Sequence, residues 1–157
     1  MTRLVWIALI GAAACSDANV AGNYMAAITN RADGCSIGWD VDESEMGISV
    51  TVTQSGSDIT LAVNSLGPAA ALGVLLGTNT FTGSVDGDDV SLSVTGTRPN
   101  TISTCTFTFN AEIDAAQDGD TMKGRIEYRA ATNDDATCGS RTGCLSLQDF
   151  NANRPPS

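Results

Sequence analysis

Cysteine is the residue type that most narrows the chemistry open to this chain. The sequence holds five cysteines and no histidine. Without histidine, neither a Ser-His-Asp triad nor a Cys-His pair can form within the chain, and the commonest general base and metal ligand is missing. No C-x-x-C pair is present, so the cysteines point to lipidation and disulfides rather than redox catalysis. We therefore expect a protein that is not an enzyme and has no catalytic residues, cofactor or metal site.

The first cysteine, Cys15, follows a segment typical of an export signal. Arg3 precedes the apolar run LVWIALI, which leads into GAAAC. A short basic region, an apolar run and a small-residue cleavage site are the marks of a signal peptide. The stretch Ala12-Ala13-Ala14-Cys15 resembles the lipobox of bacterial lipoproteins, which implies cleavage before Cys15 and a lipid on its sulfur. The alternative is an ordinary A-x-A cleavage site, simple secretion and a free thiol.

The lipobox resemblance implies a location and an organisation. The protein would lie in the bacterial cell envelope, held to a membrane through its N-terminal lipid, and Ser16 favours the outer membrane by analogy with enteric lipoproteins. The expected parts are a signal peptide (1–14), a lipidated cysteine with a short tether (15–21) and one domain (22–157). An even set of cysteines remains for disulfides in an exported chain: Cys35, Cys105, Cys138 and Cys144.

Acidic residues give the chain a formal net charge of −10. This charge argues against nucleic acid as a partner, because phosphate binding needs a clustered basic surface. Two acidic clusters, DVDESE at 40–45 and DGDD at 86–89, carry oxygen ligands of the kind that Ca²⁺ prefers. Neither matches an EF-hand loop. We interpret the first as a solvated loop and the second as a hairpin turn.

Alternation of apolar and polar residues predicts an all-β fold. Three segments repeat one design, in which two alternating runs flank a turn rich in Gly and Asp: ISVTVTQSGSDITLAV, FTGSVDGDDVSLSVTG and CTFTFNAEIDAAQDGDTMKGRIEY. Such segments are typical of antiparallel hairpins. With GNYMAAIT before them and CLSLQDFNANR after them, eight strands are expected. They favour an up-and-down antiparallel barrel, with a β-sandwich as the alternative.

The two ends of this predicted barrel resemble the lipocalin/calycin family. Gly22-Asn23-Tyr24 opens the first strand and Arg154 follows the last, which is similar to the family's Gly-x-Trp crossed by a C-terminal arginine. The resemblance implies contact between Tyr24 and Arg154, and a capacity to bind small apolar molecules. The whole chain is also similar to small bacterial envelope lipoproteins of unassigned function.

An up-and-down meander places its tight turns at one end, here called the closed end, and its longer connections at the other, the open end. The four remaining cysteines fall in or beside the longer connections. Because Cys138 and Cys144 flank the short loop GSRTG, the favoured pairs are Cys138–Cys144 and Cys35–Cys105. Pairing Cys35 with Cys144 and Cys105 with Cys138 is the rival, since those strands would be neighbours.

One connection at the open end, SLGPAAALGVLLG at 65–77, is apolar and helix-like. We interpret it first as a plug that completes the core, and second as a lid or pocket wall. The residues expected to contact a ligand in the second case are Trp39, Leu66, Leu72, Leu75 and Leu76. Two function classes follow: an anchored module that binds a small apolar ligand, or a structural or protein-interaction lipoprotein with a fully packed core that meets another envelope protein.

Overall fold

The computed structural model describes residues 17–155. The signal peptide and Cys15 therefore lie outside the described residues. The strands are β1 (Gly22–Asp33), β2 (Ser44–Ser55), β3 (Asp58–Val63), β4 (Thr80–Asp86), β5 (Asp89–Val94), β6 (Asn100–Ile102), β7 (Cys105–Asp118), β8 (Thr121–Thr132) and β9 (Ser146–Asn153). The helices are α1 (Leu66–Leu75) and the 3-10 helix η1 (Ala136–Arg141). Neither described helix has the length and apolar character needed to span a membrane.

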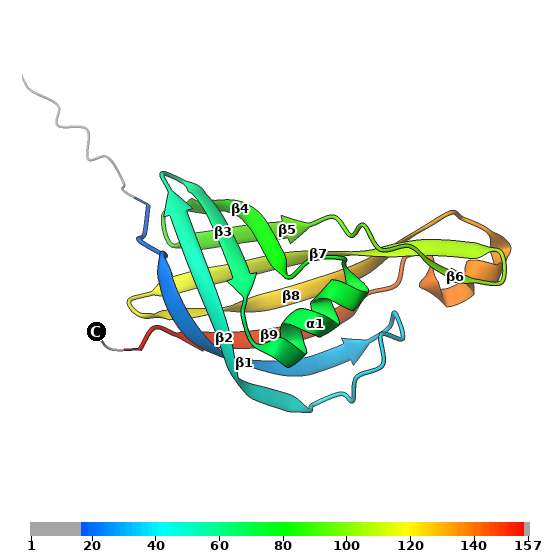
Figure 1. The fold of residues 1–157 in the computed structure, drawn as a ribbon, viewed down its shortest axis with the longest axis horizontal. Coiled ribbons are helices and arrows are strands. Elements are labelled where there is room, and N and C mark those ends of the chain that lie inside the picture. Colours follow the sequence, from blue (N-terminus) through cyan, green and yellow to red (C-terminus); the bar gives the residue numbers. More distant parts are fainter. Residues whose placement is uncertain (1–16, 156–157) are drawn as a thin grey trace, which may run out of the picture.

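Eight of the strands close into an antiparallel barrel, as the alternation predicted. Each barrel strand pairs with the next along the chain, β5 pairs with β7, and β9 returns to pair with β1 (Figure 1). The short strand β6 pairs with β7 outside this ring. Closure through β1 and β9 excludes the sandwich alternative, because the structure is one continuous sheet and not two packed layers.

The inward faces of the barrel strands are mostly apolar. Along β7, for example, Phe107, Phe109, Ala111 and Ile113 are buried and alternate with more exposed residues. In the register, Ile113 lies between Leu92 of β5 and Ile126 of β8, so the apolar sets of neighbouring strands meet inside the barrel. The period of two in the sequence thus becomes one apolar lining.

The closed end is built from two-residue turns and from the segment that precedes β1. Gly87, in the β4–β5 turn, has φ of +60°, which favours glycine. Its carbonyl accepts a 2.7 Å hydrogen bond from Ala18 N–H. Val20 is fully buried, and its N–H donates to the side-chain oxygen of Gln54 at the β2–β3 turn (2.8 Å). The segment before β1 therefore lies fixed across the base of the barrel.

The β1–β9 seam, where the first and last strands pair, is fastened at the closed end by Tyr24 and Arg154. The predicted contact between these two side chains is confirmed. Gly22 makes room for it, because a Cβ at this position would lie 3.2 Å from Arg154 Nε. Gly22 also has φ of +151°, a conformation that favours glycine. Both the backbone conformation and the packing against Arg154 thus explain why glycine stands at position 22.

The disulfides follow the rival pairing, so the favoured pairs Cys138–Cys144 and Cys35–Cys105 are wrong. Cys35 bonds to Cys144 and Cys105 bonds to Cys138. Cys35 lies just beyond the end of β1, and Cys144 lies just before β9, so strand pairing brings the two together. This disulfide fastens the open end of the β1–β9 seam.

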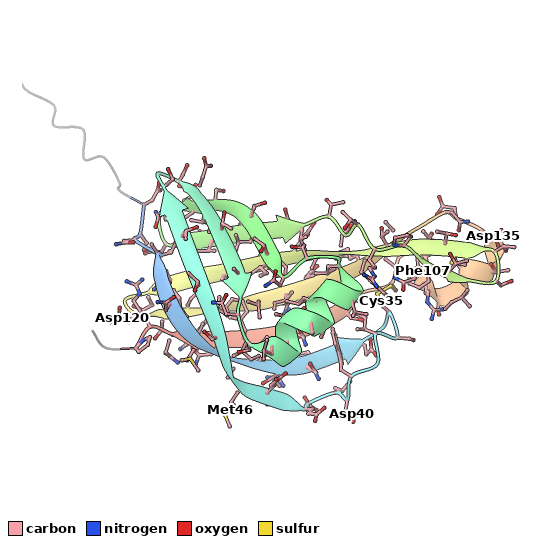
Figure 2. The ribbon with its side chains drawn as sticks, in the orientation of Figure 1. Cys35, Asp40, Met46, Phe107, Asp120 and Asp135 are labelled. Atoms are coloured by element: carbon pink, nitrogen blue, oxygen red, sulfur yellow. A yellow bond between two sulfur atoms is a disulfide. The ribbon has the colours of Figure 1, made fainter. Side chains whose placement is uncertain are left out.

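Beyond the open end, β7 and β8 continue as an arm. There β7 pairs with β6 on one side and with β8 on the other, and η1 packs against them. Figure 1 shows the arm extending away from the barrel, and Figure 2 places Asp135 at its far end and Asp120 at the closed end. The Cys105–Cys138 disulfide ties η1 to the start of β7 within this arm. Alternation in the sequence did not predict the arm.

Candidate functional site

The barrel contains a cavity of about 1030 Å³ that opens at the open end. Its wall consists of inward side chains from β1, β2, β3, β4, β7, β8 and β9, including Val50, Leu61, Phe81, Phe109, Ile113, Met122 and Ile126. Two alanines, Ala26 and Ala152, face each other across the β1–β9 seam and leave space in the wall. The core of this barrel is therefore not fully packed.

Helix α1 lies at the mouth of this cavity. Pro68, Leu72 and Leu75 line the cavity, whereas none of the residues of α1 is buried. The segment 65–77 therefore does not fill the barrel: its helix forms part of the pocket wall, while Leu76, fully buried just after the helix, packs into the core. Of the expected ligand contacts on this segment, Leu66 is 90% exposed and Leu76 is buried, and neither lines the cavity.

Trp39 lines the cavity from the connection between β1 and β2. Its ring meets the Tyr128 ring edge-on, with centroids 5.4 Å apart. The Trp39 indole N–H donates to the Ala32 carbonyl (3.2 Å). These two contacts hold a large aromatic surface at the mouth, as the sequence analysis expected for Trp39.

A chain of hydrogen bonds runs along the cavity wall, from β8 through β9 to β1. The Tyr128 hydroxyl donates to Gln148 Oε1 (2.9 Å), and Gln148 Nε2 donates to Asn30 Oδ1 (2.7 Å). Asn30 Nδ2 donates in turn to the Asp40 carbonyl (3.0 Å). Burial raises the pKa of Tyr128 well above its usual value, so this hydroxyl keeps its proton and stays a donor. These side chains give the otherwise apolar wall a polar strip.

Asp33 fixes the connection that carries Trp39. Its carboxylate accepts hydrogen bonds from the N–H groups of Ile37 (2.7 Å) and Gly38 (2.8 Å), and from the Ser146 hydroxyl (3.0 Å). Burial alone would raise the Asp33 pKa. The hydrogen bonds lower it by more than burial raises it, so the pKa lies below the usual value. The wall of the mouth is thus held by an ionised carboxylate.

Arg141 brings a positive charge to the cavity. It ends η1, lines the cavity, and places its guanidinium over the Phe107 ring at 5.2 Å from the centroid. Its Nε is shielded from solvent and has no hydrogen-bond partner within residues 17–155. The sequence analysis did not single out Arg141, although its place inside GSRTG, between two cysteines of the open end, was a readable signal.

Carboxylates also stand at the mouth. Asp40, Glu43 and Glu45 from the DVDESE cluster line the cavity opening and are exposed to solvent. The part of the chain that the structure describes contains no group of three or more acidic or cysteine side chains placed to hold a metal ion. The DGDD cluster forms the β4–β5 hairpin turn at the closed end, far from the cavity mouth.

Comparison of the chain with protein-family models, curated proteins and solved structures found no match. The site is therefore interpreted from its own geometry. An apolar cavity with a polar strip, an aromatic mouth and one arginine can hold a small molecule. Gln148 was the polar residue that alternation could have flagged, because it shares the inward face of β9 with Phe150 and Ala152.

Proposed function

We propose that this protein is an exported, lipid-anchored module of the bacterial cell envelope that binds a small apolar molecule without reacting with it. The observation that carries the proposal is the cavity of about 1030 Å³ inside the barrel, open at one end. Pockets that enclose drug-sized ligands span roughly 300–1,000 Å³ and are mostly apolar with a few polar groups. The alternative, a structural or protein-interaction role, was tied to a fully packed core, and the cavity favours ligand binding over it.

The disulfides bear on where the protein works. Two disulfides, Cys35–Cys144 and Cys105–Cys138, indicate an oxidising compartment outside the cytoplasm. An envelope or secreted protein meets this condition. The lipid anchor on Cys15 and the outer membrane as its site are the finer parts of the proposal, and they rest on the lipobox resemblance.

The fixed segment before β1 gives the proposed anchor an orientation. Asp17 accepts a hydrogen bond from Gly87 N–H (3.1 Å), so the chain is already held to the closed end two positions after Cys15. A lipid on Cys15 would hold the closed end towards the membrane. The cavity mouth, with Trp39 and α1, would face away from it.

Ligand binding is tested by narrowing the cavity. We expect the neutral fluorescent probe N-phenyl-1-naphthylamine to bind saturably to the purified protein. Ala152→Leu adds a branched side chain to the wall and should weaken binding about tenfold. Ala131→Leu, at an exposed position of β8 outside the cavity lining, is the matched control and should bind as the parent does. Absence of saturable binding by the parent, or equal binding by Ala152→Leu, would contradict the proposal.

The anchor is tested by fractionation of cells that express the full chain. The parent should sediment with membranes, and Cys15→Ser should move to the soluble fraction, because a multiply acylated cysteine holds a protein stably on a bilayer. Retention of the serine variant on membranes would rule out lipidation at Cys15 as the anchor. Labelling with a radioactive fatty acid would give a second readout that does not depend on folding.

A further inference from the structure

Arg141 is held in place by both disulfides. It lies midway between Cys138, which bonds to Cys105 on β7, and Cys144, which bonds to Cys35 beyond β1. The short segment between the two cysteines is thus tied covalently to two different parts of the open end. This double attachment fixes the backbone of Arg141 beside the cavity that the side chain lines.

The Nε of the Arg141 guanidinium has no hydrogen-bond partner among the residues that the structure describes. Arg31, Arg125 and Arg129 each form an ion pair with a carboxylate, at distances of 2.7–3.1 Å. Arg141 forms no ion pair and no side-chain hydrogen bond with any residue of 17–155, and its Nε has lost contact with water. A shielded donor of this kind is costly unless an acceptor reaches it. Its cation–π contact with Phe107 orients the group but supplies no acceptor.

The carboxylates at the mouth do not supply the missing acceptor to Arg141. Asp40, Glu43 and Glu45 line the opening, but no ion pair connects any of them with Arg141, and all three are exposed to water. They do set a limit on the ligand. Together with the net charge of −10, they disfavour a head group with more than one negative charge.

The space beside Arg141 is suited to an alkyl chain. Phe107 and Ile113 both line the cavity on the same face of β7, and strand geometry places them about 20 Å apart. Between these two levels the wall holds Phe109, Ile126 and the uncharged polar strip of Tyr128 and Gln148, and Met122 continues it towards the closed end. A chain that starts near Phe107 can therefore extend towards the closed end without meeting a charged group.

We propose that the ligand is a single-chain amphiphile with one carboxylate, whose head group binds Arg141 while its alkyl chain fills the barrel. This inference rests on the proposed function and names the ligand class for the same cavity. A carboxylate matches the planar fork of a guanidinium and accepts two hydrogen bonds from it. It also supplies the missing acceptor to a donor that the protein has already withdrawn from water.

The experiment compares three molecules with the same alkyl chain. Dodecanoate, dodecan-1-ol and dodecylammonium each compete with N-phenyl-1-naphthylamine for the purified protein at pH 7. An apolar cavity alone would prefer the alcohol, because an ionised carboxylate is costly to remove from water. We expect dodecanoate to bind at least tenfold more tightly than the alcohol. Arg141→Gln should remove this preference, so that the variant binds dodecanoate no more tightly than it binds the alcohol.

Controls separate charge, geometry and folding. Arg98→Gln removes one charge from an exposed position outside the cavity lining and should keep the preference for dodecanoate. Arg141→Lys keeps the charge but loses the planar fork, so it should keep part of the preference for dodecanoate. Binding of the neutral probe shows that each variant is folded.

Failure of the inferred ligand class can be distinguished from failure of the proposed function. Equal or tighter binding of the alcohol, tighter binding of dodecylammonium, or an unchanged preference in Arg141→Gln would overturn the inference and leave the proposed function standing. If neither the neutral probe nor any of the three competitors binds the parent protein, the proposed function is overturned, and the ligand class with it.

Discussion

Arg154 Nη2 donates a 2.7 Å hydrogen bond to the hydroxyl oxygen of Tyr24, and the guanidinium lies over the same ring, 5.3 Å from its centroid. The Tyr24 hydroxyl donates its own proton to the Val20 carbonyl (2.8 Å). Arg154 Nη2 also donates to the Asn19 carbonyl (2.9 Å). The Arg154 side chain, just after β9, thus connects the start of β1 with the segment before β1 that crosses the base of the barrel.

Replacing this arginine should destabilise the barrel. We expect Arg154→Ala to lower the free energy of unfolding by about 1–3 kcal/mol, because it removes charged hydrogen bonds and a cation–π contact from a largely buried ring. Arg129→Ala, which breaks an exposed pair with Glu127, should cost less than about 1 kcal/mol. Urea unfolding measures both variants, and equal effects would show that the Tyr24 contact contributes nothing special.

The two disulfides should differ in what they contribute to stability. Cys35–Cys144 spans 109 positions and Cys105–Cys138 spans 33. In the chain-entropy view, the longer loop restricts the unfolded state more, by about 1 kcal/mol. Paired serine substitution of Cys35 and Cys144 should therefore lower the urea midpoint further than paired substitution of Cys105 and Cys138. The reverse order would contradict an entropic origin here.

Two Gly→Ala substitutions should act in opposite directions. An added Cβ at Gly83 of β4 would clash with the Ser91 carbonyl oxygen on β5, so the strands must separate, at a cost of about 1–3 kcal/mol. At Gly73 in α1 nothing lies within 4 Å, and alanine should stabilise the helix by about 0.5–1 kcal/mol. Thermal unfolding would measure both. A stabilised Gly83→Ala variant would show that these strands do not approach so closely.

Acid should weaken the open end through Asp33. Its pKa in the folded protein lies below the model-compound value of 3.8, so its ionised form contributes stability that is present above about pH 4 and is lost as pH falls through the folded pKa. Asp33→Asn should lower stability at neutral pH and reduce the fall in stability below pH 4. Unfolding free energies measured at pH 3 to 7 test this. An unchanged acid profile in the asparagine variant would assign the acid sensitivity to other carboxylates.

The mouth and the base should respond differently to substitution. Trp39→Ala and Leu75→Ala remove cavity-lining side chains and should weaken binding of the neutral probe several-fold, as should Leu72→Ala. Asn in place of Asp58, Asp88 or Asp118, in the turns of the closed end, should leave probe binding unchanged. Loss of binding in the aspartate variants alone, with folding intact, would place the binding site at the closed end and contradict this prediction.

Period-two alternation was enough to predict the barrel strands, because inward residues such as Val50, Leu61 and Phe107 must be apolar wherever the strands pair. It was not enough to pair the cysteines. The short spacing of Cys138 and Cys144 suggested a local disulfide, but strand neighbours decided the outcome. Sequence distance is a poor guide when β1 and β9, the strands furthest apart along the chain, lie side by side.

The cavity could not be predicted from residue types alone. Whether 65–77 fills the barrel or covers it depends on where the helix sits, and an apolar sequence suits both positions. The missing hydrogen-bond partner of Arg141 Nε among residues 17–155 is likewise a property of the folded arrangement, because the sequence cannot show which acceptors approach it through space. Trp39, by contrast, was correctly placed at the open end, since its position depended only on the alternation of strand direction.

The β1–β9 seam also has a consequence for the order of folding. The three central hairpins form between residues close in sequence, whereas the seam must bring together Tyr24 and Arg154 across 130 positions. Because the entropy cost of closing a loop grows with its length, and contacts between distant residues slow folding, the seam is expected to close last and to open first. Oxidation of Cys35 and Cys144 then locks the open end of this seam, after which β1 and β9 can separate only from the closed end.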